Sequence, residues 1–270
     1  MTNKQYTSDL TAAEWQVIEK KLPEQMVSRK RKYALPIIFN AILYVLKNSC
    51  IWRDLPKDFP PYGRVFYYWN QWKNDGTIDF LHEDLYGDVR AQAGKERSPS
   101  LGIVDAQSVK ITAISSQKDC GYDAGKMIKG RKRHIMVDTM GLLIMVVVTS
   151  AAVQDRDGAR LLLQKLYDLR SFYPRLKTFM ADQGYQGPLL GDWFKEMFEK
   201  LAWVFKVVKG VAGKGFQVVP KRWIVERTFS WLYNFRRLAK DYERKTDTSE
   251  AFIQLAMIRI MAVRLTKNVI

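Results

Sequence analysis

Leu-Gly-Ile-Val-Asp-Ala-Gln-Ser-Val-Lys, residues 101–110, is the most informative segment of this 270-residue chain. Its apolar and β-branched residues predict a strand over residues 101–112. Asp105 stands inside that strand, where the apolar sequence gives way to polar sequence. A charged side chain inside a strand of a buried sheet is costly unless it is paired or bound to a metal. The stretch therefore predicts a central strand that carries a functional carboxylate.

The residues that follow predict an alternation of strands and helices. The order comprises strands over 131–139 and 142–150, a helix from 155 to about 169, a strand over 176–182, a helix over 188–200, a strand over 203–208, and helices over 221–243 and 248–266. This order predicts a mixed α/β fold. A second acid, Asp182, closes the strand over 176–182, at the sheet edge where α/β proteins bind ligands. The alternative for Asp182 is a plain turn residue.

The charge balance indicates a nucleic-acid partner. The chain has 44 Lys and Arg against 28 Asp and Glu, a net charge of +16. Residues 98–270 carry +13 of this excess and residues 1–97 carry +3. A strongly basic domain attracts phosphate backbones without regard to sequence. The alternative is a basic surface that serves solubility alone.

Metal ligands, if present, must be oxygen atoms. The chain has two cysteines and two histidines, so we expect neither a Cys/His metal cluster nor a disulfide framework. Oxygen ligands favour hard cations such as Mg²⁺ or Mn²⁺. The longest apolar run is far shorter than the roughly 20 residues that cross a bilayer, and no secretory leader opens the chain. We therefore expect a cytoplasmic protein that is nucleoid-associated when bound to DNA.

The first part of the chain predicts helices alone. They cover residues 9–22, 34–48, 62–74 and 77–93. The polar, turn-prone stretch 92–100 then predicts a boundary, so we expect a helical DNA-binding segment over 1–97 and an α/β domain over 98–270. The helix over 62–74 begins near Arg64 and is rich in aromatic residues, which either face DNA or form the segment's own small core.

Glu226 is the third candidate acid. It lies in Trp-Ile-Val-Glu-Arg-Thr-Phe (223–229), a predicted helix, on one face with Arg222 and Arg237. An acid among arginines suits a metal ligand beside phosphates, and the alternative is an exposed pair with Arg222. Other acids have local explanations: Asp138 lies in a hairpin turn, and Asp155 and Asp157 precede a helix, where they act as caps.

Four segments together resemble the DDE transposases of bacterial insertion sequences, and the insertion-sequence-five family in particular. They are Val-Asp-Ala-Gln-Ser-Val-Lys (104–110), Gly-Tyr-Asp-Ala-Gly-Lys-Met-Ile-Lys-Gly-Arg-Lys-Arg-His (121–134), Ala-Asp-Gln-Gly-Tyr-Gln-Gly (181–187) and Arg-Trp-Ile-Val-Glu-Arg-Thr-Phe-Ser-Trp-Leu (222–232). Asn-Phe-Arg-Arg-Leu-Ala-Lys-Asp-Tyr-Glu (234–243) and the N-terminal Trp-Arg-Asp-Leu-Pro (52–56) extend the resemblance over nearly the whole chain.

The resemblance implies an RNase H-like catalytic core in which Asp105, Asp182 and Glu226 form the DDE triad and hold two Mg²⁺ ions, for which Mn²⁺ can substitute. It further implies cleavage of double-stranded DNA at the inverted repeats of the element, followed by transfer of a 3′-hydroxyl into target DNA. Because the two ends must be paired, we expect a homodimer on DNA. The alternatives are an RNase H-like nuclease without strand transfer and a catalytically silent DNA-binding protein.

The family pattern around the glutamate is Tyr, Arg, Glu and Lys at set spacings. Arg222 fits this pattern, whereas Val219 and Tyr233 stand at the Tyr and Lys positions. Basic residues one turn further on are candidate substitutes, and a basic loop over 126–133 is a candidate phosphate site. The expected DNA contacts are Arg64, Lys126, Lys129, Arg131, Lys132, Arg133, Arg222, Arg227, Arg236, Arg237 and Lys240.

Overall fold

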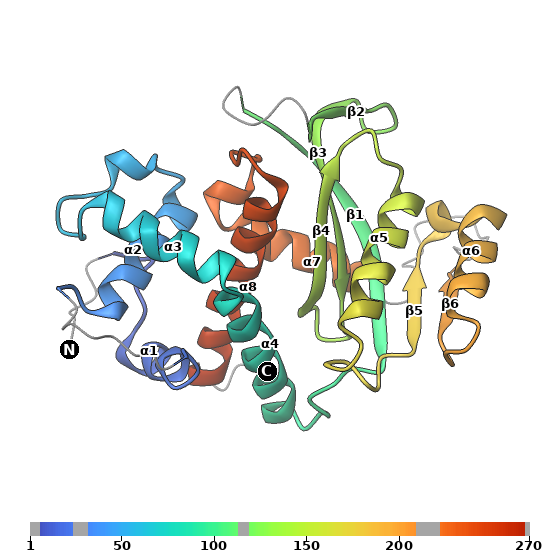
Figure 1. Ribbon diagram of the computed structural model, residues 1–270, viewed down its shortest axis with the longest axis horizontal. Helices are drawn as coiled ribbons and strands as arrows, with labels where there is room; N and C mark the ends of the chain where they lie inside the picture. Colours follow the sequence, from blue (N-terminus) through green and yellow to red (C-terminus); the bar gives the residue numbers. More distant parts are fainter. Residues whose placement is uncertain (1–5, 24–31, 113–118, 209–221, 268–270) are drawn as a thin grey trace. The chain divides into compact units, whose positions relative to one another are not determined.

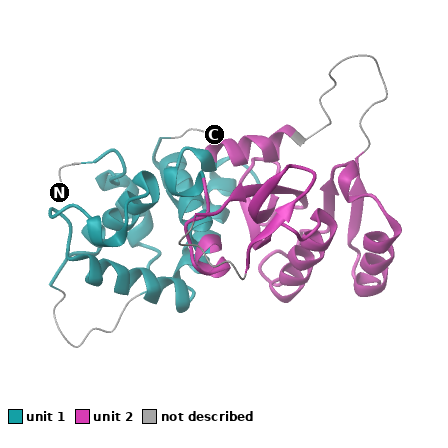
Figure 2. Cartoon of the chain, turned by 90° about the horizontal axis from the view of Figure 1, so that it is seen from above, with its two compact units in different colours: residues 1–95, 232–239, 251–270 teal, residues 96–231, 240–250 magenta. Residues whose placement is uncertain are grey.

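A computed structural model describes residues 6–23, 32–112, 119–208 and 222–267. The chain forms two compact units (Figure 2). Unit 1 comprises residues 1–95, 232–239 and 251–270, and unit 2 comprises residues 96–231 and 240–250. Unit 1 thus takes two segments that the sequence assigned to the domain over 98–270. This division also changes the charge balance, because each unit now carries a net charge of +8.

Unit 2 is built on one mixed sheet (Figure 1). Its strands are β1 (Leu101–Lys110), β2 (Gly121–Asp123), β3 (Ile128–Val137), β4 (Leu143–Ser150), β5 (Thr178–Ala181) and β6 (Val204–Val207). β1, β3 and β4 pair antiparallel, β2 adds to β3, and β5 and β6 continue from β1 in parallel. The mixed α/β fold predicted from the sequence is confirmed.

Helices of unit 2 cover the sheet and connect its strands. They are α5 (Asp155–Asp168), η3 (Gln183–Tyr185), α6 (Pro188–Phe198) and most of α7 (Arg222–Tyr233). α5 contacts β1, β3 and β4. The approach is close at Gly158, where an added Cβ would lie 2.0 Å from the His134 ring. The β3 side chains that face α5 are therefore buried beneath it.

The helix predicted over 221–243 is wrong beyond Tyr233. α7 ends there, and the short η4 (Arg236–Leu238) follows. The backbone of Asp241 then leaves helical geometry to extend the β1 ladder: its N–H donates to the Lys110 carbonyl at 2.8 Å, and its carbonyl accepts from the Thr112 N–H at 3.2 Å. Pairing with a strand has replaced the helical hydrogen bonds that the local sequence favours.

Unit 1 is helical in the part that the structure describes. Its elements are α1 (Ala12–Glu19), α2 (Leu35–Asn48), η1 (Trp52–Asp54), α3 (Tyr62–Asn74), α4 (Thr77–Gln92), η4 and most of α8 (Thr246–Lys267). Trp69 is buried and stacks on Phe252 of α8 with ring centroids 4.2 Å apart. Trp72 is also buried, whereas Phe66 and Tyr67 are exposed. The aromatic residues of α3 thus divide between the core and the surface.

Each unit contains one buried histidine. His82 on α4 and His134 on β3 are buried, and burial lowers the pKa of each from 6.5 to about 4. Both imidazoles are therefore neutral in the folded chain at pH values where the unfolded chain protonates them. Because the unfolded chain binds more protons between pH 6.5 and about 4, we expect the free energy of unfolding to fall as pH drops through that window.

The histidine effect is testable by substitution. The pKa shift corresponds to roughly 3 kcal/mol per histidine. Denaturant unfolding at pH 7 and pH 4.5 should show a smaller loss of stability in His82→Phe than in the wild type, because phenylalanine takes up no proton when the chain unfolds. Nε2 of His82 is buried without a hydrogen-bond partner, so the substitution removes no hydrogen bond of that atom. An equal loss in the two proteins would contradict this assignment.

Candidate active site

Asp105 and Asp182 lie at the same level of two neighbouring parallel strands. The β1–β5 pairing runs through Ile103 and Met180. Asp105 follows two residues later within β1, and Asp182 follows two residues later, directly after the end of β5. Residues at one level of adjacent parallel strands point to the same face of a sheet, with backbones about 4.8 Å apart. The two carboxylates, which are 77 positions apart in the sequence, are thus brought together at one sheet edge.

Both aspartates are oriented by backbone N–H groups. The Asp105 carboxylate accepts from the N–H of Ala106 at 2.7 Å. The Asp182 carboxylate accepts from the N–H of Gly184 at 2.9 Å and caps the η3 turn. Both side chains are half-buried. Each carboxylate is oriented by a hydrogen bond from a nearby backbone N–H, and each remains partly exposed to solvent.

Tyr185 and Asp155 join this edge and were missed as site residues. Tyr185 ends the η3 turn and is buried. Its pKa is raised well above the ordinary value by burial, and then by the charges of Asp105, Asp155 and Asp182. The negative charges of three carboxylates thus raise the pKa of one phenol. The sequence explained Asp155 as a helix cap, so its proximity to Tyr185 could be found only from the packing of α5 against η3.

A network of ion pairs links Asp155 to the first strands of the sheet. Nζ of Lys132 lies 2.9 Å from Asp155 and 3.2 Å from Asp123. Burial opposes the charge of Asp123, but hydrogen bonds from Ser108, the Lys126 backbone and Lys132 outweigh it and lower its pKa to about 2. Asp123 is therefore ionised throughout the physiological range, and it ties Lys132 to the sheet.

Glu226 is exposed on α7. Its neighbours fix the helix to the β3–β4 turn: Arg227 donates to the Met140 carbonyl at 2.9 Å, and Thr228 donates to the Gly141 carbonyl at 2.7 Å. Among the described residues, no group of three or more His, Cys, Asp or Glu side chains is arranged to hold a metal ion. The structure therefore brings Asp105 and Asp182 together but does not add Glu226 to them.

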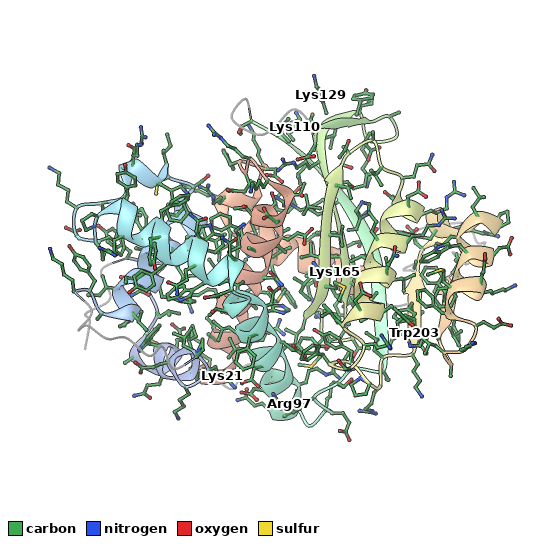
Figure 3. All side chains as sticks on the ribbon, in the orientation of Figure 1. Lys21, Arg97, Lys110, Lys129, Lys165 and Trp203 are labelled. Carbon is green, nitrogen blue, oxygen red and sulfur yellow. The ribbon has the colours of Figure 1, made fainter. Side chains whose placement is uncertain are left out.

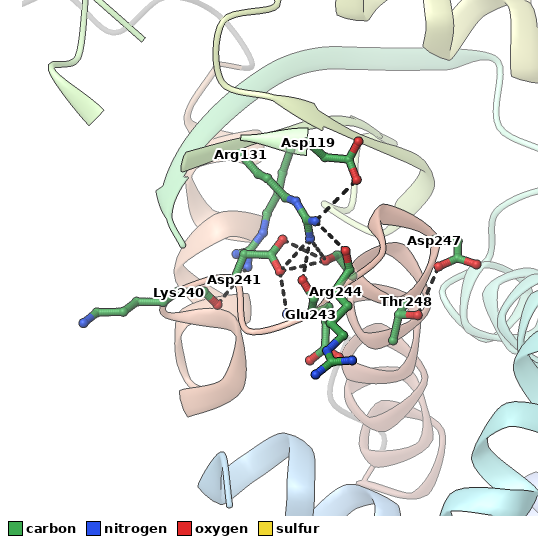
Figure 4. Close-up of polar contacts among 10 residues, drawn as sticks. Asp119, Arg131, Lys240, Asp241, Glu243, Arg244, Asp247 and Thr248 are labelled. Carbon is green, nitrogen blue, oxygen red and sulfur yellow. Dashed lines mark hydrogen bonds and ion pairs between the residues drawn. The ribbon is translucent and has the colours of Figure 1, made fainter. Parts of the chain in front are cut away.

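Three of the expected DNA contacts require correction. Arg131, Lys132 and Arg133 are 0%, 5% and 2% exposed. Arg131 pairs with Asp241 at 3.2 Å and donates to the Glu243 and Arg244 carbonyls at 2.9 Å each (Figure 4). These side chains lie in a strand that is covered on both faces, so they hold the fold together and cannot meet a phosphate.

Arg237 also requires correction. It is buried in unit 1, where its guanidinium lies 4.7 Å from the Phe252 ring centroid. Arg227 is half-buried, with its guanidinium over the rings of Trp223 and Trp231. The side chain of Arg222 lies outside the described residues.

The remaining basic candidates are exposed. Lys129 lies at the outer end of the β2–β3 pair (Figure 3). Nζ of Lys126 donates to the Ala106 carbonyl at 3.1 Å, next to Asp105. The others are Arg64, Arg236 and Lys240.

Asp138 plays the local part expected of a turn residue. It is fully buried, and its carboxylate accepts from the Met140 and Leu142 N–H groups at 2.8 and 2.9 Å. Its interpretation as a hairpin residue is confirmed.

Comparison with known proteins assigns the chain to a family. Residues 96–261 match the model of the transposase DDE domain, which is more than half of the chain. The chain belongs to the DDE transposase family. Residues 10–82 match a second model, described as "Putative transposase of IS4/5 family". The DDE domain implies an RNase H-like fold, which is in accord with the mixed sheet of unit 2.

A curated relative supports the same assignment. The "Putative transposase for insertion sequence element IS402" from Burkholderia cepacia is 29% identical over 130 residues, which cover 47% of this chain and 60% of the relative. The match thus spans less than two thirds of that protein's length. Within the described residues, no helix is long and apolar enough to cross a membrane.

Proposed function

We propose that this protein is a DNA transposase that cleaves the ends of an insertion sequence and joins them to target DNA. The observation that carries the proposal is the pair Asp105 and Asp182, level on adjacent strands at one edge of a DDE domain. Two half-buried carboxylates at one level are a suitable donor set for a hard divalent cation. The net charge of +16 suits a polyanionic substrate.

Asp105 and Asp182 would hold the metal, and Glu226 would complete the ligand set once α7 and DNA are engaged. Members of this family generally use divalent metal ions, and we propose two Mg²⁺ ions, with Mn²⁺ as a substitute. Bound ions would supply an activated water and stabilise the charge on the leaving oxygen. Lys126, beside Asp105, is positioned to bind a phosphate near the reacting group.

The reaction has two displacements at phosphorus. Water attacks the phosphodiester at the element end, the bond to the flanking strand breaks, and the element keeps a free 3′-hydroxyl. That hydroxyl attacks a phosphodiester of the target, a new P–O bond forms, and the target strand leaves. Asp105 and Asp182 serve both steps, so the protein needs no nucleophile of its own. Pairing of two element ends calls for at least a dimer on DNA.

A strand-transfer assay tests this function. Labelled DNA bearing the inverted repeat that flanks the gene is incubated with the full chain, target DNA and Mn²⁺. We expect a joined product. Cleaved ends without joining would indicate an RNase H-like nuclease, and neither product would indicate a silent DNA-binding protein.

We further propose that unit 1 reads the sequence of the element ends through the outer face of α3. Buried Val65, Trp69 and Trp72 anchor the inner face of this helix. The outer face lines a shallow groove with Gly63, Phe66, Tyr67, Asn70, Gln71 and Asn74. α3 contains no carboxylate, and its amide groups suit base edges in a major groove. Arg64 would bind a phosphate at the start of the helix.

Substitution of Gln71 tests whether the outer face of α3 recognises the DNA sequence. Gln71→Ala should reduce the preference for the inverted repeat over unrelated DNA by about 5- to 100-fold, since a bidentate base contact contributes about 1–3 kcal/mol of discrimination. Salt-sensitive binding to unrelated DNA should persist. Gln16→Ala, an exposed glutamine on α1, is the matched control. An unchanged preference in the α3 variant would place recognition elsewhere.

A further inference from the structure

The hydroxyl of Tyr185 is buried without a hydrogen-bond partner. Tyr185 is 2% exposed, and hydrogen bonds fix the backbone of the turn that carries it. Its N–H donates to the Asp182 carbonyl at 3.1 Å. Nη1 of Arg156 donates to the carbonyl of the next residue, Gln186, at 3.3 Å. The turn that carries Tyr185 is thus fixed to the first turn of α5.

An unpartnered buried hydroxyl is unfavourable for folding. It has lost its hydrogen bonds to water without gaining others, whereas phenylalanine would fill the same space without that loss. Burial raises the pKa of this hydroxyl well above its ordinary value, and the negative charges of Asp105, Asp155 and Asp182 raise it further. A phenol with its ordinary pKa of about 10 is protonated at neutral pH, so this hydroxyl can donate a hydrogen bond to a carboxylate.

We propose that Tyr185 is a positioning residue of the carboxylate site, whose hydroxyl donates to an oxygen of the Asp105–Asp182 pair when a divalent cation is bound. This inference rests on the proposed function, since it takes the pair to be a metal site. A carboxylate that binds a cation through one oxygen leaves its other oxygen to be oriented by a hydrogen bond. Groups in this position commonly change metal affinity by about 10- to 100-fold.

Tyr185→Phe separates this role from a structural one, because the two roles predict different changes. In the metal-free protein, the thermal midpoint should stay the same or rise, because only the unpartnered hydroxyl is removed. The affinity for Mn²⁺, measured by titration with electron paramagnetic resonance, should fall about 10- to 100-fold.

Tyr173→Phe is the matched control. Tyr173 is also buried, but its hydroxyl donates to the Ile144 carbonyl at 3.4 Å. This variant should lose thermal stability and keep its Mn²⁺ affinity, the reverse of Tyr185→Phe.

Asp105→Asn distinguishes failure of this inference from failure of the proposed function. It should abolish Mn²⁺ binding at this edge. If Asp105→Asn loses Mn²⁺ and Tyr185→Phe binds it as the wild type does, the positioning role is overturned and the metal site stands. If Asp105→Asn still binds Mn²⁺ normally, the metal site itself is overturned, and the role of Tyr185 with it.

Discussion

Asp105→Asn, Asp182→Asn and Glu226→Gln are each expected to reduce DNA cleavage by about a thousandfold or more, while DNA binding changes little. Each substitution keeps the shape of the side chain and removes the negative charge that would hold a cation. Loss of several kcal/mol of transition-state stabilisation corresponds to this factor. Binding depends instead on Lys and Arg contacts to phosphates. Cleavage rates at saturating Mg²⁺, together with filter binding of labelled DNA, measure the two effects separately.

Asp157→Asn is the control for these variants. Asp157 lies on the first turn of α5, and its side chain is 56% exposed in a weak pair with Arg160 at 3.6 Å. Cleavage by this variant should match the wild type. Asp138 would be a poor control, because its buried carboxylate closes the β3–β4 turn. Substantial cleavage by any one of the three variants would remove that residue from the triad.

Arg131→Met is expected to lower the free energy of unfolding by about 3–5 kcal/mol. The substitution removes the buried guanidinium that pairs with the carboxylate of Asp241, 1% exposed, and removal of one partner of a buried pair has this magnitude. It also removes the donors to the Glu243 and Arg244 carbonyls. Denaturant unfolding measures the loss.

A second variant completes the test of Arg131. Lys129→Met, on the same strand and exposed, should change stability by less than about 0.5 kcal/mol. If the two variants unfold at the same denaturant concentration, Arg131 is not a structural residue. It would then return to the set of possible DNA contacts.

The sequence predicted the central part of unit 2 because there the local pattern and the tertiary structure agree. Asp105 interrupts an apolar strand and Asp182 ends one, and a parallel pair of strands brings two such positions together. The strands over 101–112 and 142–150 and the turn at Asp138 follow from alternation and turn chemistry, which act over a few residues.

Other parts of the structure depend on contacts between residues that are far apart in the sequence. Arg131, Lys132 and Arg133 read as a basic surface loop, but β3 pairs with strands on both sides and its side chains are covered on both faces. The helix predicted over 221–243 does not reach Asp241, because the backbone of that residue pairs with the end of β1. Phe252 packs on Trp69, so α8 joins the N-terminal helices. No local pattern indicates these partners.

The grouping of α8 with unit 1 also affects how DNA recognition is tested. Deletion of residues 1–95 would expose Phe252 and the other buried residues of α8 that pack in unit 1. Loss of repeat preference in such a truncation would not separate recognition from misfolding. Single substitutions on the outer face of α3 avoid this problem, because Asn70, Gln71 and Asn74 are not part of the core.

The position of Mn²⁺ in crystals of the DNA-bound protein shows directly whether Asp105 and Asp182 form a metal site. Anomalous scattering locates the ion without reference to activity. We expect Mn²⁺ bound by the carboxylates of Asp105 and Asp182, with Glu226 brought into the same site by DNA. Manganese bound only at other acids, such as Asp123 and Asp155, with Asp105 and Asp182 sharing no ion, would contradict it.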